Sequence, residues 1–222
     1  MAPYVDFHTH CRRGDALEIL NIDPLDEESF VLAVECGLPF SVGMHPWRTA
    51  ESAERLNEAF ERMDRVAQNG QAMAIGECGL DWSVDVDRRL QTEVFERQLE
   101  LAKQCNLPVI LHCVRAFEDV MSRLVRAKAE RAVFHSFIGS TEQVARIVSK
   151  GYFCSFSPRS LASARTCEVI RRITPSALLI ERDEFECPID EVYSAVAALR
   201  GCSIGELREI VFDNYKRLID NE

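Results

Sequence analysis

Two histidines separated by a single residue follow a short apolar run near the start of the chain, in the segment YVDFHTHC. Alternate side chains of an extended strand share a face, so Asp6, His8 and His10 are expected to point the same way. Two neutral imidazoles on one face can bind a single metal cation. A polar strand end without a function would show the same pattern, so the rest of the chain has to decide between these interpretations.

Other side chains of metal-binding type come at or after the ends of later apolar runs. They are His45, Glu77, His112, His135 and Asp183, so all five histidines of the chain occupy such positions. In a parallel barrel the carboxyl ends of the strands form one face, where these groups would converge. Crowded imidazoles repel one another when protonated, and metal cations are the expected compensation.

Eight short apolar or β-rich runs could supply the strands that position these side chains. They span residues 4–8, 16–22, 40–44, 72–77, 108–113, 132–137, 152–156 and 177–182. Apolar residues recur at helical spacing between many of them, and most runs are too apolar to leave one face in water. The pattern predicts an α/β fold, a (β/α)8 TIM-type barrel, with an open doubly wound sheet as the alternative. The first connection, CRRGD, is too short for a helix, so the barrel should be irregular there.

Composition limits the classes of partner and the compartment. With 222 residues, of which 47% are hydrophobic, the chain can form one globular domain, and no linker or repeat divides residues 1–222. A formal net charge of −10 disfavours a surface that attracts DNA generally, so contact with nucleic acid would be confined to a cleft. The nine cysteines form no C-x-x-C pair, and no apolar run is long enough to span a bilayer. We therefore expect a cytoplasmic protein without a membrane partner.

The ordered motifs DFHTH, GMHPW, AIGECGLDW, LPVILHC, VFHSF and LLIERD cover nearly the whole chain. Together they resemble the TatD family of metal-dependent deoxyribonucleases, within the amidohydrolase-like barrels, of which this chain would be a short and divergent member. The H-x-H opening alone is shared by many metal hydrolases, but the series with GECGLD in its middle is specific.

The resemblance implies a hydrolase that binds two divalent metal ions, Mg²⁺, Mn²⁺ or Zn²⁺. The implied metal ligands are His8, His10, Glu77, His112, His135 and Asp183. Glu77 would bridge the ions, and Asp183 would orient or deprotonate the attacking water, so both carboxylates are expected to be catalytic.

Substrate binding is expected from His45, Arg115 and Arg182. His45 resembles the family position that contacts substrate phosphate, although it could instead pack on Trp47. The arginine common in the family two positions after the strand-five histidine is replaced by Val114, and Arg115 comes one position later.

Arg182 stands where the family commonly has threonine. It could contact phosphate, or it could form a surface ion pair with its neighbour Glu181, which we slightly favour. Asp81 could fix a ligand imidazole or cap the helix that follows it.

The first functional prediction is a deoxyribonuclease that acts on ester bonds of DNA, as a monomeric exonuclease for single-stranded or frayed ends. The alternative is a metal-dependent hydrolase of a small phosphoester, lactone or cyclic amide, which needs no arginine clamp. A non-catalytic metal-binding scaffold is a third possibility, disfavoured by the intact ligand positions. A nucleotide site also needs rings for base stacking, and the rings next to the predicted site are Trp47, Trp82, Phe137 and Phe185.

Overall fold

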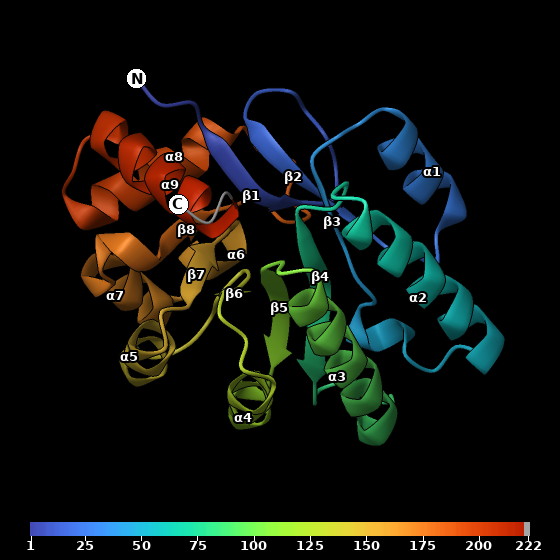
Figure 1. Cartoon of the computed structure of the whole chain (residues 1–222). Coiled ribbons are helices and arrows are strands. Elements are labelled where there is room, and N and C mark those ends of the chain that lie inside the picture. The colour runs from blue at the N-terminus through green and yellow to red at the C-terminus, as the bar shows by residue number, and fades with distance from the viewer. Residues whose placement is uncertain (220–222) are drawn as a thin grey trace. The chain divides into compact units, whose positions relative to one another are not determined.

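The computed structural model describes residues 1–219, in which strands and helices alternate along most of the chain (Figure 1). The strands are β1 (Val5–Thr9), β2 (Leu17–Ile22), β3 (Phe40–Val42), β4 (Ala74–Asp81), β5 (Val109–Val114), β6 (Ala132–Phe134), β7 (Phe153–Phe156) and β8 (Leu178–Ile180). The helices are α1 (Glu27–Glu35), α2 (Ala53–Gln68), α3 (Arg88–Gln104), α4 (Phe117–Ala127), α5 (Thr141–Ser149), α6 (Pro158–Leu161), α7 (Ala164–Arg172), α8 (Ile189–Arg200) and α9 (Ile204–Ile219). Two short 3₁₀ segments, η1 (Pro46–Arg48) and η2 (Pro175–Ala177), precede α2 and β8.

The eight strands form one sheet in which their order follows the chain from β1 to β8. The pairs β2–β3, β3–β4, β4–β5, β6–β7 and β7–β8 are parallel. Strands therefore form in all eight predicted runs, in the order expected for successive β/α units. The connection between β1 and β2 contains no helix, as its length predicted.

The chain divides into two compact units, one made of residues 1–19 and 133–222 and the other of residues 20–132. A single domain over residues 1–222 stays a prediction. No helix within residues 1–219 is long and apolar enough to cross a membrane.

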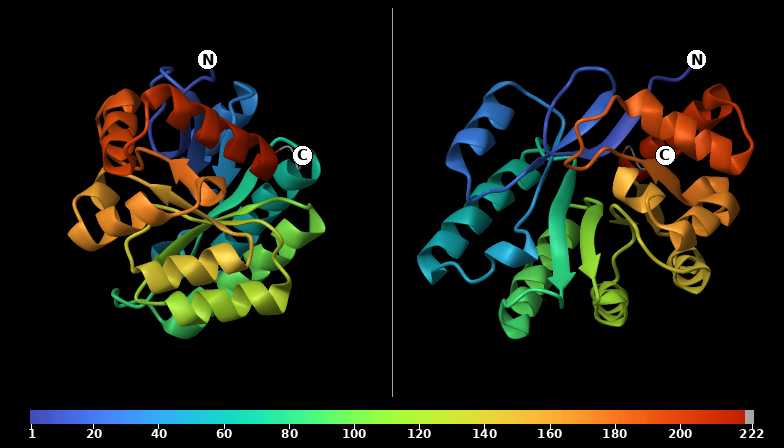
Figure 2. Two further views of the ribbon diagram at one scale, coloured as in Figure 1. Left: turned by 90° about the vertical axis from the view of Figure 1, so that its left-hand side faces the viewer. Right: turned by 180° about the vertical axis from the view of Figure 1, so that it is seen from behind.

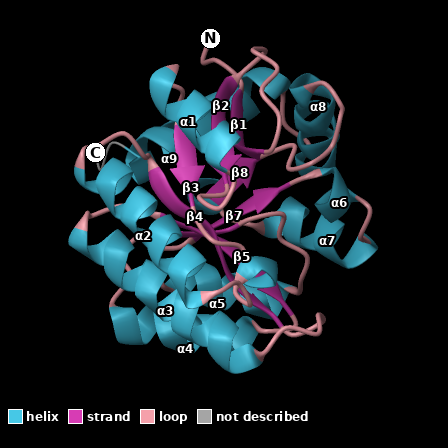
Figure 3. Cartoon of the chain, turned by 90° about the vertical axis from the view of Figure 1, so that its right-hand side faces the viewer, coloured by secondary structure: helices cyan, strands magenta, loops and turns pink. Residues whose placement is uncertain are grey.

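In the unit of residues 20–132, amphipathic helices cover the strands. Helix α2 begins after Ser52, whose side chain accepts a hydrogen bond from the Arg55 backbone, and its buried residues include Phe60 and Met63. Helix α3 packs against β4 and lies next to α2 and α4 (Figure 3). Its buried face includes Phe95 and Leu99, which are four residues apart and so share one side of the helix.

In the other unit, helix α9 packs on β8 and β1 (Figure 2). A capping box precedes α9, because the Glu206 carboxylate accepts from the Ser203 backbone and the Ser203 hydroxyl accepts from the Glu206 backbone. On α8, the hydroxyl of the buried Tyr193 bonds both the backbone N–H and C=O of Val5. Helices α8 and α9 thereby fix the strand that carries the first two histidines.

Strand β4 contains two glycines because neighbouring backbone leaves no space for side chains. A Cβ atom at Gly76 would lie 2.4 Å from the Ile110 carbonyl oxygen, and one at Gly79 would lie 2.0 Å from the His112 carbonyl oxygen. Both glycines also have positive φ angles, 146° and 147°. The pairing of β4 with β5 shifts register between Ile75 and Cys78. Glu77 lies within this irregular stretch of the strand.

Candidate metal centre

His45, Glu77 and His112 bring one ligand atom each to within 4.8 Å of one another; we call these three residues the Glu77 cluster. Glu77 Oε1 lies 2.6 Å from His112 Nδ1 and 3.3 Å from His45 Nε2, and these two nitrogens are 3.0 Å apart. Glu77 itself is only 4% exposed. Two imidazoles and a carboxylate therefore face one point next to β4 and β5.

The elements around the Glu77 cluster hold its backbone in place. The Glu77 N–H donates to Asn21 Oδ1 at 2.9 Å, within the irregular part of β4. On α3, the buried Gln98 side chain accepts from the Met44 N–H and donates to the Met44 C=O, one residue before His45. These side-chain hydrogen bonds satisfy backbone groups at and next to the cluster and hold the chain there.

Asp81, at the end of β4, links His112 to Trp47. Its Oδ2 accepts from the Trp47 indole N–H at 2.8 Å and lies 3.3 Å from His112 Nε2. Burial raises the pKa of Asp81, but hydrogen bonds from His112, Ser83 and Trp47 outweigh burial and hold the pKa below its ordinary value. Asp81 thus stays ionised and can orient the imidazole. The alternative role as a helix cap is wrong, since Asp87 caps α3.

Replacing Asp81 by asparagine is expected to weaken metal binding about 10-fold to 100-fold, because groups that orient a ligand imidazole have effects of that size. Titration calorimetry of the metal-stripped protein with Mn²⁺ or Zn²⁺ would measure the change. Asp119→Asn is a matched control, since Asp119 also accepts from an indole N–H, that of Trp82, at an exposed position. Equal metal affinity in wild type and Asp81→Asn would contradict the orienting role.

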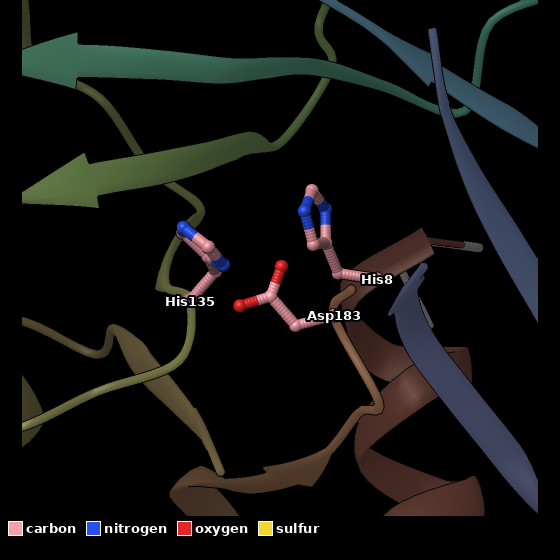
Figure 4. Close-up of side chains that lie close together, drawn as sticks. All are labelled: His8, His135 and Asp183. Carbon is pink, nitrogen blue, oxygen red and sulfur yellow. The ribbon is translucent and has the colours of Figure 1, made fainter. Parts of the chain in front are cut away.

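The second cluster lies in the other unit and consists of His8, His135 and Asp183, which we call the Asp183 cluster. Their ligand atoms lie within 4.8 Å of one another. The His8 and His135 rings have centroids 4.6 Å apart and lie on either side of the Asp183 carboxylate (Figure 4). His10 Nε2 is 3.4 Å from Asp183 Oδ1, which adds a third imidazole at the margin. The predicted convergence of His8, His10, His135 and Asp183 is therefore present within this unit.

Asp183 is held by backbone contacts with β1. Its N–H donates to the His8 C=O at 3.0 Å, and its C=O accepts from the His10 N–H at 3.2 Å. Its φ angle of 62° is left-handed, a conformation that aspartate adopts more readily than most residues. The chain thereby turns at the end of β8 and directs this carboxylate to the two imidazoles.

Glu181 has a role that the sequence interpretation missed. It is fully buried, and its Oε1 lies 3.3 Å from His135 Nδ1 and accepts from the Ser136 N–H at 2.6 Å. Its other oxygen accepts from the Ser155 hydroxyl. A carboxylate on Nδ1 fixes the imidazole tautomer that leaves Nε2 available as a ligand. The sequence does show a glutamate two residues before Asp183. Its partners, however, lie on β7 and just after β6, far from it along the chain, so its contact with His135 could not be predicted.

The expected surface ion pair between Arg182 and Glu181 is wrong. The Arg182 side chain is fully buried, and its guanidinium donates to Asp6 at 2.7 Å, to Asp15 at 3.0 Å and to Glu18 at 2.6 Å. All three carboxylates belong to the unit that contains the Asp183 cluster. The predicted phosphate contact through Arg182 is corrected as well, because the guanidinium is enclosed and engaged by carboxylates.

The other two predicted substrate residues lie in the unit of residues 20–132. His45 belongs to the Glu77 cluster, and its ring meets that of Trp47 edge-on, with centroids 4.7 Å apart. Arg115 is exposed directly after β5, with a left-handed φ angle of 53°. The contact of either residue with substrate stays a prediction.

The donor sets of both clusters fit divalent metal ions. Each cluster combines two imidazoles with one carboxylate within 4.8 Å, a mixture suited to zinc, manganese or nickel. The geometry inside each unit therefore supports the prediction that this chain binds metal ions.

Three comparisons place this chain among known proteins. The family model described as TatD related DNase matches residues 32–220. The metal-dependent hydrolase YabD of Bacillus subtilis, described as uncharacterized, is 29% identical over 218 residues, 89% of this chain and 80% of that protein. The 3′-5′ ssDNA/RNA exonuclease TatD of Erwinia tasmaniensis is 29% identical over 204 residues, 81% of this chain and 77% of that protein.

Solved structures show the same fold. The crystal structure of YjjV, a TatD homologue from Escherichia coli, aligns with a TM-score of 0.83 and 23% identity and covers 98% of both chains. Together with the order of the eight strands, this alignment confirms the predicted (β/α)8 barrel class and leaves the open doubly wound sheet without support.

Proposed function

The chain belongs to the family of TatD-related DNases, and from this premise we propose that it is a metal-dependent deoxyribonuclease that hydrolyses phosphodiester bonds at single-stranded or frayed DNA ends. The predicted resemblance to this family is confirmed. The observation that carries the proposal is the pair of clusters, each with two imidazoles and a carboxylate. A scaffold without catalytic activity would not need such donors.

We propose the ligand set His8, His10, Glu77, His112, His135 and Asp183 for two divalent ions, which are Mg²⁺, Mn²⁺ or Zn²⁺. When bound, such ions lower the pKa of water and stabilise charge on phosphodiester oxygens. The Asp183 cluster offers three of these donors, and the Glu77 cluster offers two, Glu77 and His112, next to the substrate residue His45.

Within this proposal the side chains have distinct tasks. Asp183 orients the attacking water and accepts its proton, a task for a carboxylate held next to imidazoles rather than in open solvent. Glu181 keeps His135 in one tautomer, and Asp81 does the same for His112. His45 and the exposed Arg115 contact the substrate phosphate.

DNA is favoured over a small phosphoester, lactone or cyclic amide because a relative that aligns with 81% of this chain is named as an exonuclease for single-stranded DNA and RNA. A monomeric state is part of the proposal, as is a cytoplasmic location, which agrees with nine free thiols.

Metal removal tests the proposed function directly. The chelator-treated protein should leave end-labelled single-stranded DNA intact, and adding Mg²⁺, Mn²⁺ or Zn²⁺ separately should restore stepwise shortening, because the donors need a cation to act on phosphate. Denaturing gels of the labelled products would identify the working ion. A Glu77→Gln preparation, purified in the same way, controls for contaminating nuclease. Intact DNA with protein that calorimetry shows to be loaded with metal would overturn the assignment.

A further inference from the structure

The indole of Trp47 is exposed although it lies next to the Glu77 cluster, whose two imidazoles are half-buried and whose carboxylate is buried. The residue exposes 57% of its surface, whereas the nearby Asp81 exposes only 1%. A large aromatic side chain that faces water beside a proposed active site can bind an apolar part of the substrate.

Trp47 is held in a fixed orientation. Its Nε1–H donates to Asp81 Oδ2 at 2.8 Å, and it sits in the middle of η1, which begins at Pro46. The side chain of His45 accepts from the Trp47 backbone N–H. A ring restrained by its backbone and by its indole nitrogen loses little conformational freedom when a ligand binds.

The ring contacts described for the indole are perpendicular rather than stacked. The His45 ring meets it at 84° and the His112 ring at 71°, with centroids 4.7 Å and 6.1 Å away. Both imidazoles are therefore nearly perpendicular to the indole, and neither covers an indole face by parallel stacking. The same two imidazoles belong to the Glu77 cluster, so a planar group on Trp47 would lie next to the candidate metal donors.

The other three predicted rings are less suited to this task. Phe137 is only 6% exposed and packs edge-on against Phe156. The guanidinium of Arg88 lies over the Trp82 ring, 5.0 Å from its centroid, and that of Arg159 lies 5.9 Å from the Phe185 centroid. Trp47 is thus the favoured stacking residue of the four.

We propose that Trp47 stacks on the nucleobase next to the phosphodiester that is cleaved, and that Asp81 holds the indole in place for this contact. The inference rests on the proposed nuclease function and adds a base-binding subsite to it. Because every nucleobase has a planar face, this contact favours single-stranded nucleic acid without selecting a sequence.

Trp47→Ala should lower kcat/KM for a single-stranded oligonucleotide about 5-fold to 150-fold, the range for loss of one base–aromatic stack. The loss should disappear with an oligonucleotide whose terminal nucleotides are abasic, since that substrate keeps the phosphates but has no terminal base. Trp47→Phe should retain part of the activity. Leu32→Ala is the control, because Leu32 is another exposed apolar residue of the same unit, 59% exposed on α1. The Leu32→Ala variant should cleave both substrates as wild type does.

Fluorescence provides a second readout that does not depend on turnover. The chain has two tryptophans, so in a Trp82→Phe protein all indole emission comes from Trp47. Trithymidylate added with Mg²⁺, before measurable hydrolysis, should quench that emission, whereas the matching abasic trinucleotide should not.

The outcomes separate this inference from the nuclease assignment. If wild type cleaves base-bearing and abasic ends equally well and Trp47→Ala matches it, the stacking subsite is wrong and the nuclease function stands. If wild type cleaves no oligonucleotide, the nuclease function fails. The quenching of Trp47 fluorescence then decides alone whether the base-binding subsite exists. Quenching by trithymidylate only would support a base-binding subsite, whereas no quenching, or equal quenching by the abasic trinucleotide, would overturn it.

Discussion

Glu77→Gln is expected to lower metal-dependent turnover by more than about 100-fold, since even groups that only orient metal ligands change activity by up to that factor. Glu77 Oε1 is the atom on which His112 Nδ1 and His45 Nε2 converge, at 2.6 Å and 3.3 Å. The amide has nearly the same shape as the carboxylate but carries no charge to attract a cation. Steady-state kinetics at the Mg²⁺, Mn²⁺ or Zn²⁺ concentration that just saturates wild type would measure the loss.

The fold of the Glu77→Gln variant should be intact. The backbone bond from Glu77 to Asn21 and the close packing of Gly76 on β5 do not involve the carboxylate. Circular dichroism and the thermal unfolding midpoint should therefore match those of wild type. Glu93→Gln, a neutral change at an exposed position on α3, serves as the matched control and should keep full activity. Wild-type turnover in Glu77→Gln would rule out a role for this carboxylate in metal binding.

Calorimetry then shows why turnover is lost. If Glu77 is a ligand, the variant should bind metal more weakly, and excess metal should recover part of the activity. Unchanged metal affinity with lost turnover would instead assign the carboxylate to the substrate or to proton transfer.

The strands, and the histidines and carboxylates that gather at strand ends, could be predicted because both depend on local sequence. Apolar runs of four to eight residues mark strands of a parallel sheet, and the histidines follow those runs at the ends where barrel enzymes place their sites. His8 and His10 share a face through strand alternation alone. No contact across the sequence had to be known for these predictions.

The partners of charged side chains could not be predicted in the same way. Arg182 was paired with its neighbour Glu181, but it binds Asp6 and Glu18, which precede it by 176 and 164 residues. Glu181 instead contacts His135, 46 residues earlier. The Asp81 bond to the Trp47 indole spans 34 residues. Such pairs depend on which strands become neighbours, and single-sequence patterns do not contain that information.

Replacing Arg182 by methionine is expected to reduce the free energy of unfolding by about 3 to 5 kcal/mol, the range for breaking a buried ion pair by removing one partner. Asp6 is fully buried and Glu18 is 8% exposed. Methionine fills much of the space but leaves both carboxylates without their cation. Asp15, whose side chain is 41% exposed, can be solvated and should add little to the loss.

The effect of Arg182→Met should depend on pH through Asp6. Burial raises the pKa of Asp6 from 3.8 to about 7, although hydrogen bonds from Arg182 act in the lowering direction. Between these values the folded chain holds a proton that the unfolded chain has released, so stability falls as pH rises. Without Arg182 the pKa of Asp6 should rise further. The difference in stability between wild type and variant should therefore widen as pH rises through about 7.

Urea unfolding followed by circular dichroism, at about pH 6 and about pH 8.5 on either side of the Asp6 transition, would measure both effects. Arg171→Met is the matched control, because Arg171 forms an exposed pair with Glu168 and should contribute less than about 1 kcal/mol. At about pH 8.5, combining Arg182→Met with Asp6→Asn should recover part of the stability, since no buried aspartate then has to ionise, or hold a proton against the solvent pH, without its cation. A loss in Arg182→Met no larger than in Arg171→Met, or one that shrinks as pH rises, would contradict the buried ion network.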